Sequence, residues 1–89
     1  MEGQRALITG GGSGIGLRLA ERFAQAGARV ALCDSNPAAI ARMHADRPEI
    51  IARQADVTDE TEMAAFLADV EAQWGGVDVV CDIDRKSVV

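Results

Sequence analysis

The chain has 89 residues, a length that suits one small domain. Apolar residues make up 48% and charged residues 26% of the sequence, which is typical of globular rather than disordered proteins. The formal net charge of −5 argues against a nucleic acid or an anionic membrane as a partner, because both bind positively charged surfaces.

Neither membrane insertion nor secretion is expected. The apolar runs are too short to span a bilayer, and the opening MEGQRALITG lacks the pattern of a signal peptide. Cys33 and Cys81 lie far apart, outside any CxxC motif and without a histidine at ligand spacing. We interpret them as small apolar residues in a reducing compartment rather than as metal or redox groups. The sequence therefore predicts a cytoplasmic protein without a metal site.

Short apolar runs alternate with segments of helical periodicity along the chain. Four runs are typical of buried strands and cover residues 5–9, 28–34, 49–54 and 76–81. Between the first two, apolar residues repeat at the helical spacing over residues 15–26. Strands separated by helices of this length run parallel, with right-handed crossovers. The sequence thus predicts an α/β fold, a doubly wound parallel sheet in the order β-α-β-α-β-α-β.

Two further helices are marked by capping residues. Asn36 and Pro37 fit the N-cap and the first position of a helix that ends before Pro48. Either Thr58 or Asp59 can cap a third helix. The inner face of that third helix is expected to carry Met63, Phe66 or Leu67, Val70 and Trp74.

Five glycines stand within residues 10–16, between the first strand and the first helix. The unpaired N–H groups and the dipole of a helix N-terminus attract anions, so this loop predicts a phosphate-bearing ligand. Gly10 permits the turn out of the strand, and a side chain at Gly12 or Gly14 would block a pyrophosphate from the backbone. Gly16 lets the helix pack closely on the sheet.

The spacing of these glycines limits the kind of nucleotide. A Walker A loop requires a lysine and a hydroxyl residue where Leu17 and Arg18 stand, so nucleoside triphosphate hydrolysis is disfavoured. The strict GxGxxG fingerprint fails in every frame. The pattern that fits is TGxxxGxG, which begins at Thr9 and ends Gly14-Ile15-Gly16. It resembles the cofactor loop of the short-chain dehydrogenase/reductase family, and we interpret the Thr9 hydroxyl as structural.

Three later segments strengthen this resemblance. Asp34 ends the second strand, where an acid can accept both hydroxyls of a ribose. Asp56 and Val57 resemble the family's adenine-contacting pair, and GGVDVV at 75–80 resembles its entry into the fourth strand. The resemblance implies the cofactor-binding N-terminal part of a Rossmann-like domain, residues 1–83, with strand order 3-2-1-4 and truncated after the fourth strand.

The residues at the second strand favour NAD over NADP. A carboxylate at Asp34 would repel the 2′-phosphate of NADP, and Ser13 stands where NADP-preferring members of the family often carry arginine. Asp34 could also be an ordinary solvent-facing carboxylate, and Asp56 could simply belong to the turn before the third helix. The predicted cofactor-binding residues are Gly10, Gly12, Ser13, Gly14, Ile15, Gly16, Asp34, Asp56 and Val57.

The resemblance stops after the fourth strand. The family usually reads NNAG there, whereas this chain has Asp82 to Arg85. The family's catalysis rests on Ser, Tyr and Lys, but the chain has no tyrosine and its only lysine is Lys86. We expect no catalytic residues here. The parent would be an NAD-dependent oxidoreductase, a homo-oligomer acting on a small alcohol or carbonyl compound; the alternative is a stand-alone, non-catalytic dinucleotide-binding or sensing module.

The last residues, DRKSVV at 84–89, differ from the rest in composition. One back-translation, GAT CGG AAG AGC GTC GTG, matches the start of a widely used DNA-sequencing adapter, in which the next triplet is a stop. We therefore expect residues 84–89 to be a non-native tail of translated adapter, and other codons in the DNA would refute this. A truncated sheet would also expose its fourth strand, which predicts poor solubility.

Overall fold

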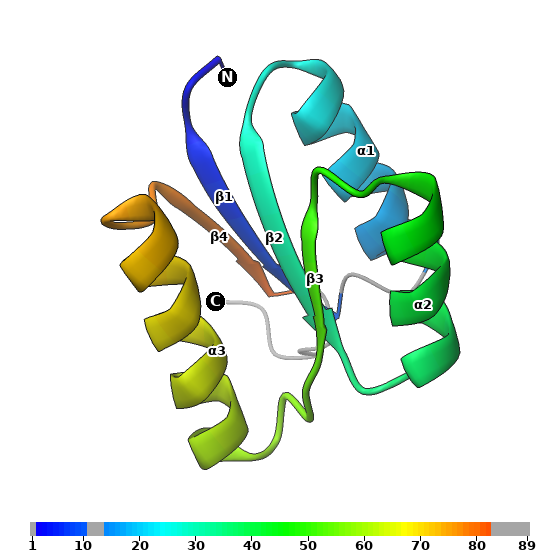
Figure 1. Ribbon diagram of the computed structural model, residues 1–89, viewed down its shortest axis with the longest axis vertical. Helices are drawn as coiled ribbons and strands as arrows, with labels where there is room; N and C mark the ends of the chain where they lie inside the picture. Colours follow the sequence, from blue (N-terminus) through cyan, green and yellow to red (C-terminus); the bar gives the residue numbers. More distant parts are fainter. Residues whose placement is uncertain (1, 11–13, 83–89) are drawn as a thin grey trace.

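In the computed structural model, which describes residues 2–10 and 14–82, strands and helices alternate in chain order (Figure 1). The strands are β1 (Arg5–Thr9), β2 (Arg29–Asp34), β3 (Ile51–Gln54) and β4 (Val79–Asp82). The helices are α1 (Gly14–Gln25), α2 (Pro37–Asp46) and α3 (Glu60–Trp74). The predicted alternation is confirmed.

All four strands are parallel and lie in the order β3-β2-β1-β4. Ala6 of β1 is opposite Val30 on one side and Val79 on the other, so β1 is enclosed by two neighbours. The chain moves outward from β1 to β3 and then returns to place β4 on the other side of β1. The predicted α/β fold with order 3-2-1-4 is therefore confirmed, and the order reverses between β1 and β4.

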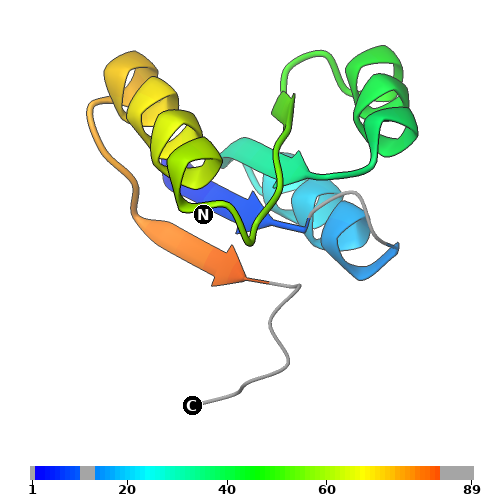
Figure 2. The same ribbon diagram turned by 90° about the horizontal axis from the view of Figure 1, so that it is seen from below.

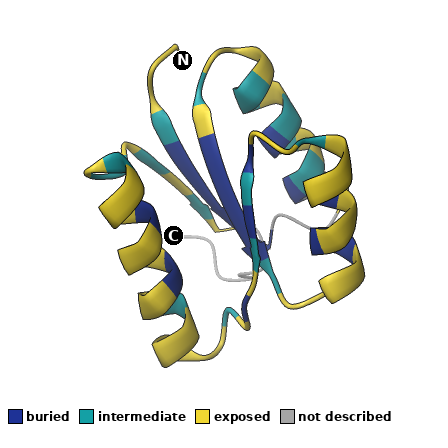
Figure 3. Ribbon diagram, in the orientation of Figure 1, coloured by how far each residue is buried: buried dark blue, intermediate teal, exposed yellow. Residues whose placement is uncertain are grey.

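Helices cover both faces of the sheet (Figure 2). Ile8 packs with Ala20 and Met43 on the face of α1 and α2, whereas the neighbouring Leu7 packs with Phe66 on the face of α3. Successive strand residues point to opposite faces, and both faces are covered at the centre of the sheet. This explains why the strands are almost continuously apolar and why their buried segments cluster at the centre in Figure 3.

The ends of the helices follow the capping signals. The Asn36 side chain accepts hydrogen bonds from two backbone N–H groups of α2, and Asp59 does the same for α3. Asp59 rather than Thr58 is therefore the cap of the third helix. Gly75 ends α3 with a left-handed φ of 81°, a conformation that glycine adopts without strain.

One expectation about element positions is wrong in detail, and one pair of alternatives is decided by the structure. The fourth strand begins at Val79 and includes Asp82, instead of covering residues 76–81. Its start is set by Asp78, which pairs with Arg5 at the beginning of β1. On α3, Phe66 faces the core with 1% of its surface exposed, whereas Leu67 is 39% exposed.

Candidate functional site

Most of the predicted site residues lie at the carboxyl ends of the strands, on one side of the molecule. Gly10 follows β1, Asp34 ends β2, and Asp56 follows β3. In open parallel sheets ligands bind outside these ends, at the point where the strand order reverses. That point lies here between β1 and β4, beside Gly10. The strand order thus reverses next to the glycines that the sequence singles out.

The glycines at the start of α1 leave space for a ligand. Gly10 has a left-handed φ of 77°, and its N–H donates to the carbonyl of Cys33 at 2.7 Å. Gly14 is the first residue of α1, and a Cβ added there would meet no described atom within 4 Å. The packing of the described residues therefore gives no reason for a glycine at position 14, whereas a ligand against the backbone would give one. Gly16 is buried within α1, as close packing of this helix requires.

Part of the predicted loop lies outside the described residues, namely Gly12 and Ser13. Ile15 lies in the first turn of α1. The first turn of this helix has no acidic residue. An anion at the helix N-terminus would therefore meet its positive dipole end without repulsion from a carboxylate in that turn.

Asp34 is fixed at the end of β2 by its own turn. Its Oδ1 accepts a hydrogen bond from the Asn36 N–H at 2.8 Å, and its carbonyl accepts from the Ala55 N–H at 3.0 Å. Cys33 is opposite Thr9 in the register of β1 and β2, so Asp34 and Gly10 leave the sheet side by side. Asp34 is half-buried. This placement suits an acceptor for ribose hydroxyls next to a diphosphate site.

Asp56 is a turn residue in the structure. Its Oδ1 accepts from the N–H and the hydroxyl of Thr58, at 2.9 and 2.7 Å. These hydrogen bonds, the hydroxyl's first, hold the pKa of Asp56 below its ordinary value. Its own N–H donates to Glu62 at 3.1 Å, a contact that the sequence analysis missed. Val57 is half-buried and packs against the core beneath α3. Asp56 thus belongs to the turn before the third helix, which was the alternative to its role at adenine. Its contact with adenine stays a prediction.

A contact between β1 and β4 was also missed. The buried Thr9 hydroxyl donates to Asp82 Oδ1 at 2.9 Å, although the two residues are 73 positions apart. Thr9 therefore has a structural hydroxyl, as expected, but it binds the end of β4. Only the pairing of Thr9 with Asp82 in the parallel sheet could have revealed this contact. That pairing depends on the register of β4.

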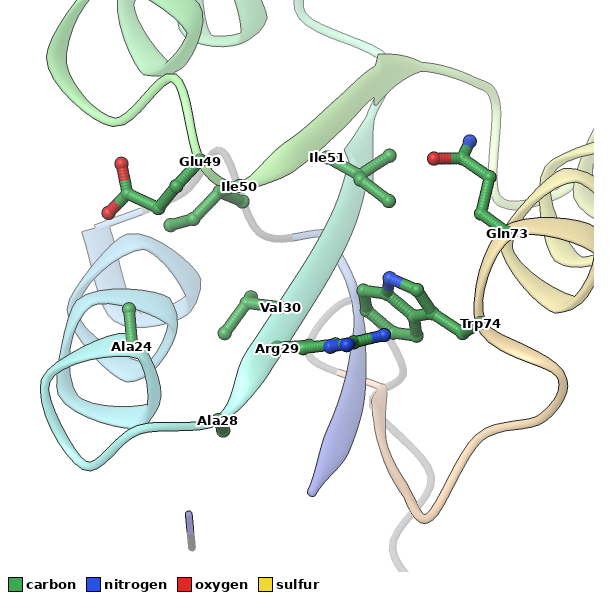
Figure 4. Close-up of a pocket in the computed structure, with 9 residues that line it drawn as sticks. All are labelled: Ala24, Ala28, Arg29, Val30, Glu49, Ile50, Ile51, Gln73 and Trp74. Atoms are coloured by element: carbon green, nitrogen blue, oxygen red, sulfur yellow. The ribbon is translucent and has the colours of Figure 1, made fainter. Parts of the chain in front are cut away.

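A cavity of about 390 Å³ lies at the amino ends of the strands (Figure 4). It is lined by the starts of β2 and β3 and by Trp74 at the end of α3. Because ligands of open parallel sheets bind at the carboxyl ends of the strands, this cavity is not the candidate site. Within residues 2–10 and 14–82, no three His, Cys, Asp or Glu side chains group in a way that could hold a metal ion.

Comparison with known proteins gives a consistent result. The chain matches the short chain dehydrogenase family over residues 4–82. Sorbitol dehydrogenase from Cereibacter sphaeroides is 37% identical over 81 residues, which cover 90% of this chain and 32% of that enzyme. No helix in the described part of the chain is both long and apolar enough to cross a membrane.

Solved structures share the fold. The 3-ketoacyl-(acyl-carrier-protein) reductase from Brucella melitensis, complexed with NADH, is 36% identical with a TM-score of 0.82, covering 89% of this chain and 33% of the reductase. A variant of actinorhodin polyketide ketoreductase with NADPH is 31% identical with a TM-score of 0.84. The match covers 92% of this chain and 34% of the ketoreductase. The chain thus spans about a third of the length of these relatives.

Proposed function

The chain belongs to the short-chain dehydrogenase family, and on that premise we propose that it binds NAD at the carboxyl edge of its sheet. A bound nicotinamide dinucleotide supplies a hydride donor or acceptor. The residues that would hold it are the backbone of Gly10 to Gly16 for the diphosphate, Asp34 for the adenosine ribose, and Asp56 with Val57 for the adenine.

The open space at Gly14 is the observation that carries this proposal. It lies at the N-terminus of α1, where the positive end of the helix dipole favours an anion. A backbone that approaches a diphosphate closely must lack a side chain at the point of contact. The nucleotides in the structures of the two solved relatives, NADH and NADPH, are of the class that this geometry suits.

We propose NAD rather than NADP because of the charge at Asp34. Its carboxylate is held at the end of β2 by the Asn36 N–H, and Asp34 leaves the sheet beside Gly10, so it would face the ribose hydroxyls of a nucleotide bound there. A 2′-phosphate in that position would bring two like charges within a few ångströms of each other, which costs about 1 to 4 kcal/mol at the dielectric constants of a protein surface.

Titrations of the chain with NAD and with NADP test this preference. The wild type should bind NAD more tightly, and Asp34→Asn should reduce the NAD-to-NADP affinity ratio at least about fivefold. Asparagine still offers an oxygen to the Asn36 N–H, so the turn is retained. The matched control is Asp46→Asn, an exposed position at the end of α2, which should leave the ratio unchanged. An unchanged ratio in Asp34→Asn would contradict the assignment.

We propose that the chain is the cofactor-binding part of a longer oxidoreductase that acts on an alcohol or carbonyl compound. Its share of the relatives' length supports this, as does the lack of tyrosine in its sequence. We propose that residues 84–89 are a non-native tail, which the codons of the underlying DNA would test. Cys33 and Cys81 form no disulfide in the described structure, which supports the proposed cytoplasmic location. The parent enzyme is proposed to be a homo-oligomer.

A further inference from the structure

The carboxylate of Asp82 is held at the point where the strand order reverses. Asp82 is the last residue of β4 and lies opposite Thr9, which directly precedes Gly10. The Thr9 hydroxyl, on a residue only 5% exposed, donates to Asp82 Oδ1 at 2.9 Å. A buried donor on a central strand therefore holds the Asp82 carboxylate at the carboxyl end of β4, next to the end of β1.

Asp82 lies on the side of β1 where the nicotinamide half of a bound dinucleotide is expected. Under the proposed function the adenosine ribose lies at Asp34, at the end of β2, and the diphosphate lies at the N-terminus of α1, after β1. A dinucleotide bound across the reversal point must then continue to the other side of β1, which is the side of β4. The nicotinamide half would thus lie on the side of Asp82.

We propose that Asp82 is a specificity-determining residue that makes this site favour the oxidised cofactor over the reduced one. The inference rests on the proposed function. The nicotinamide ring carries a positive charge in NAD⁺ and none in NADH, whereas the adenosine and diphosphate groups are the same in both. A fixed carboxylate on the nicotinamide side attracts the oxidised ring and has no comparable attraction for the reduced one. Its repulsion of the diphosphate acts equally on both forms and cancels in their affinity ratio.

The test is the ratio of the dissociation constants for NAD⁺ and NADH, measured by NMR titration of the wild-type chain and of Asp82→Asn. Asparagine is isosteric and can still accept the Thr9 hydrogen bond, so only the charge is removed. We expect the ratio to shift about threefold to tenfold in favour of NADH, as loss of one partly screened charge pair at the protein surface predicts. A second neutral variant, Asp82→Ser, should shift it in the same direction.

Two controls separate this inference from general electrostatics. Asp34→Asn removes a carboxylate on the adenosine side and should leave the NAD⁺-to-NADH ratio unchanged. ADP-ribose lacks the nicotinamide and should respond to Asp82→Asn as NADH does, not as NAD⁺ does. If both cofactors bind and neither Asp82 variant changes the ratio, this inference fails and the proposed function stands. If the folded wild-type chain binds neither cofactor, both fail.

Discussion

Arg5 and Asp78 join the starts of β1 and β4 through several hydrogen bonds. The backbone N–H and Nε of Arg5 donate to Asp78 Oδ2 at 2.8 and 3.0 Å, and its Nη2 donates to Oδ1 at 3.0 Å. These bonds to the Arg5 side chain, and then to its backbone, lower the pKa of Asp78 from 3.8 to about 2. A single carboxylate thus fixes where β4 begins beside β1.

This pair predicts how stability depends on pH. Because the pKa of Asp78 is lower in the folded chain, its contribution is complete above pH 3.8 and is lost as the pH falls towards about 2. In urea unfolding at a series of pH values, Asp78→Asn should be less stable than the wild type at neutral pH. It should also lose less stability than the wild type between pH 4 and pH 2, the interval given by the two values of the Asp78 pKa.

Arg5→Gln and the double variant provide the control for this prediction. If the pair acts as a unit, the two single substitutions and the double substitution should destabilise the chain by similar, non-additive amounts. Fully additive losses, or an unchanged acid profile in Asp78→Asn, would contradict the role of the pair.

At the scale of elements, α3 connects β3 on one side of the sheet with β4 on the other. Its N-terminus is capped by Asp59, whose Oδ1 accepts from the N–H groups of Thr61 and Glu62 at 2.9 and 3.1 Å. Its inner face buries Phe66 and Val70, with 1% and 0% of their surfaces exposed. Backbone hydrogen bonds and this packing hold the middle of the helix, whereas the cap satisfies N–H groups at its start.

Loss of this cap should destabilise the chain measurably. Asp59→Ala removes the acceptor for two backbone N–H groups and should lower the free energy of unfolding by about 1 kcal/mol. Asp59→Asn should cost much less, because asparagine is an equally good cap. Urea unfolding followed by the fluorescence of Trp74 measures both. An Asp59→Ala variant as stable as the wild type would show that the cap is unimportant.

On the scale of the whole molecule, the sheet is unevenly covered. The face of β1 and β4 beside α3 holds an open groove of about 320 Å³, and β4 is the least buried strand (Figure 3). Val80 and Leu67, which line this groove, are 62% and 39% exposed. β4 is also an edge of the described sheet, and exposed apolar edges favour association between chains.

We therefore expect the isolated chain to associate with itself through this region. Val80→Lys places a charge on the exposed edge strand and should shift the chain towards monomer in sedimentation velocity experiments at matched concentrations. Ala72→Lys, at an exposed position on α3, adds the same charge elsewhere and should have little effect. A wild-type chain that stays monomeric at high concentration, with a cooperative near-UV circular dichroism melt, would contradict this expectation.

The agreement between sequence and structure is closest where the signal is local. The Asn36–Pro37 pair predicted the start of α2, and the alternation of apolar runs predicted parallel strands joined by helices. The strand order itself was implied by the family resemblance. The start of β4 was misplaced because its glycine-rich entry resembles a continuous apolar run, whereas Asp78 is drawn out of that run by Arg5. Leu67 and Phe66 could not be separated because both fit a broad helical stripe.

The sequence by itself determined the order of elements, the caps and the glycine loop, because each follows from residues within a few positions of one another. Only the tertiary structure decided which carboxylate meets the end of β1. Asp82 reaches Thr9 across 73 positions because β4 inserts beside β1. This contact depends on register and crossover direction, which are set by burial of both sheet faces together and not by any local pattern.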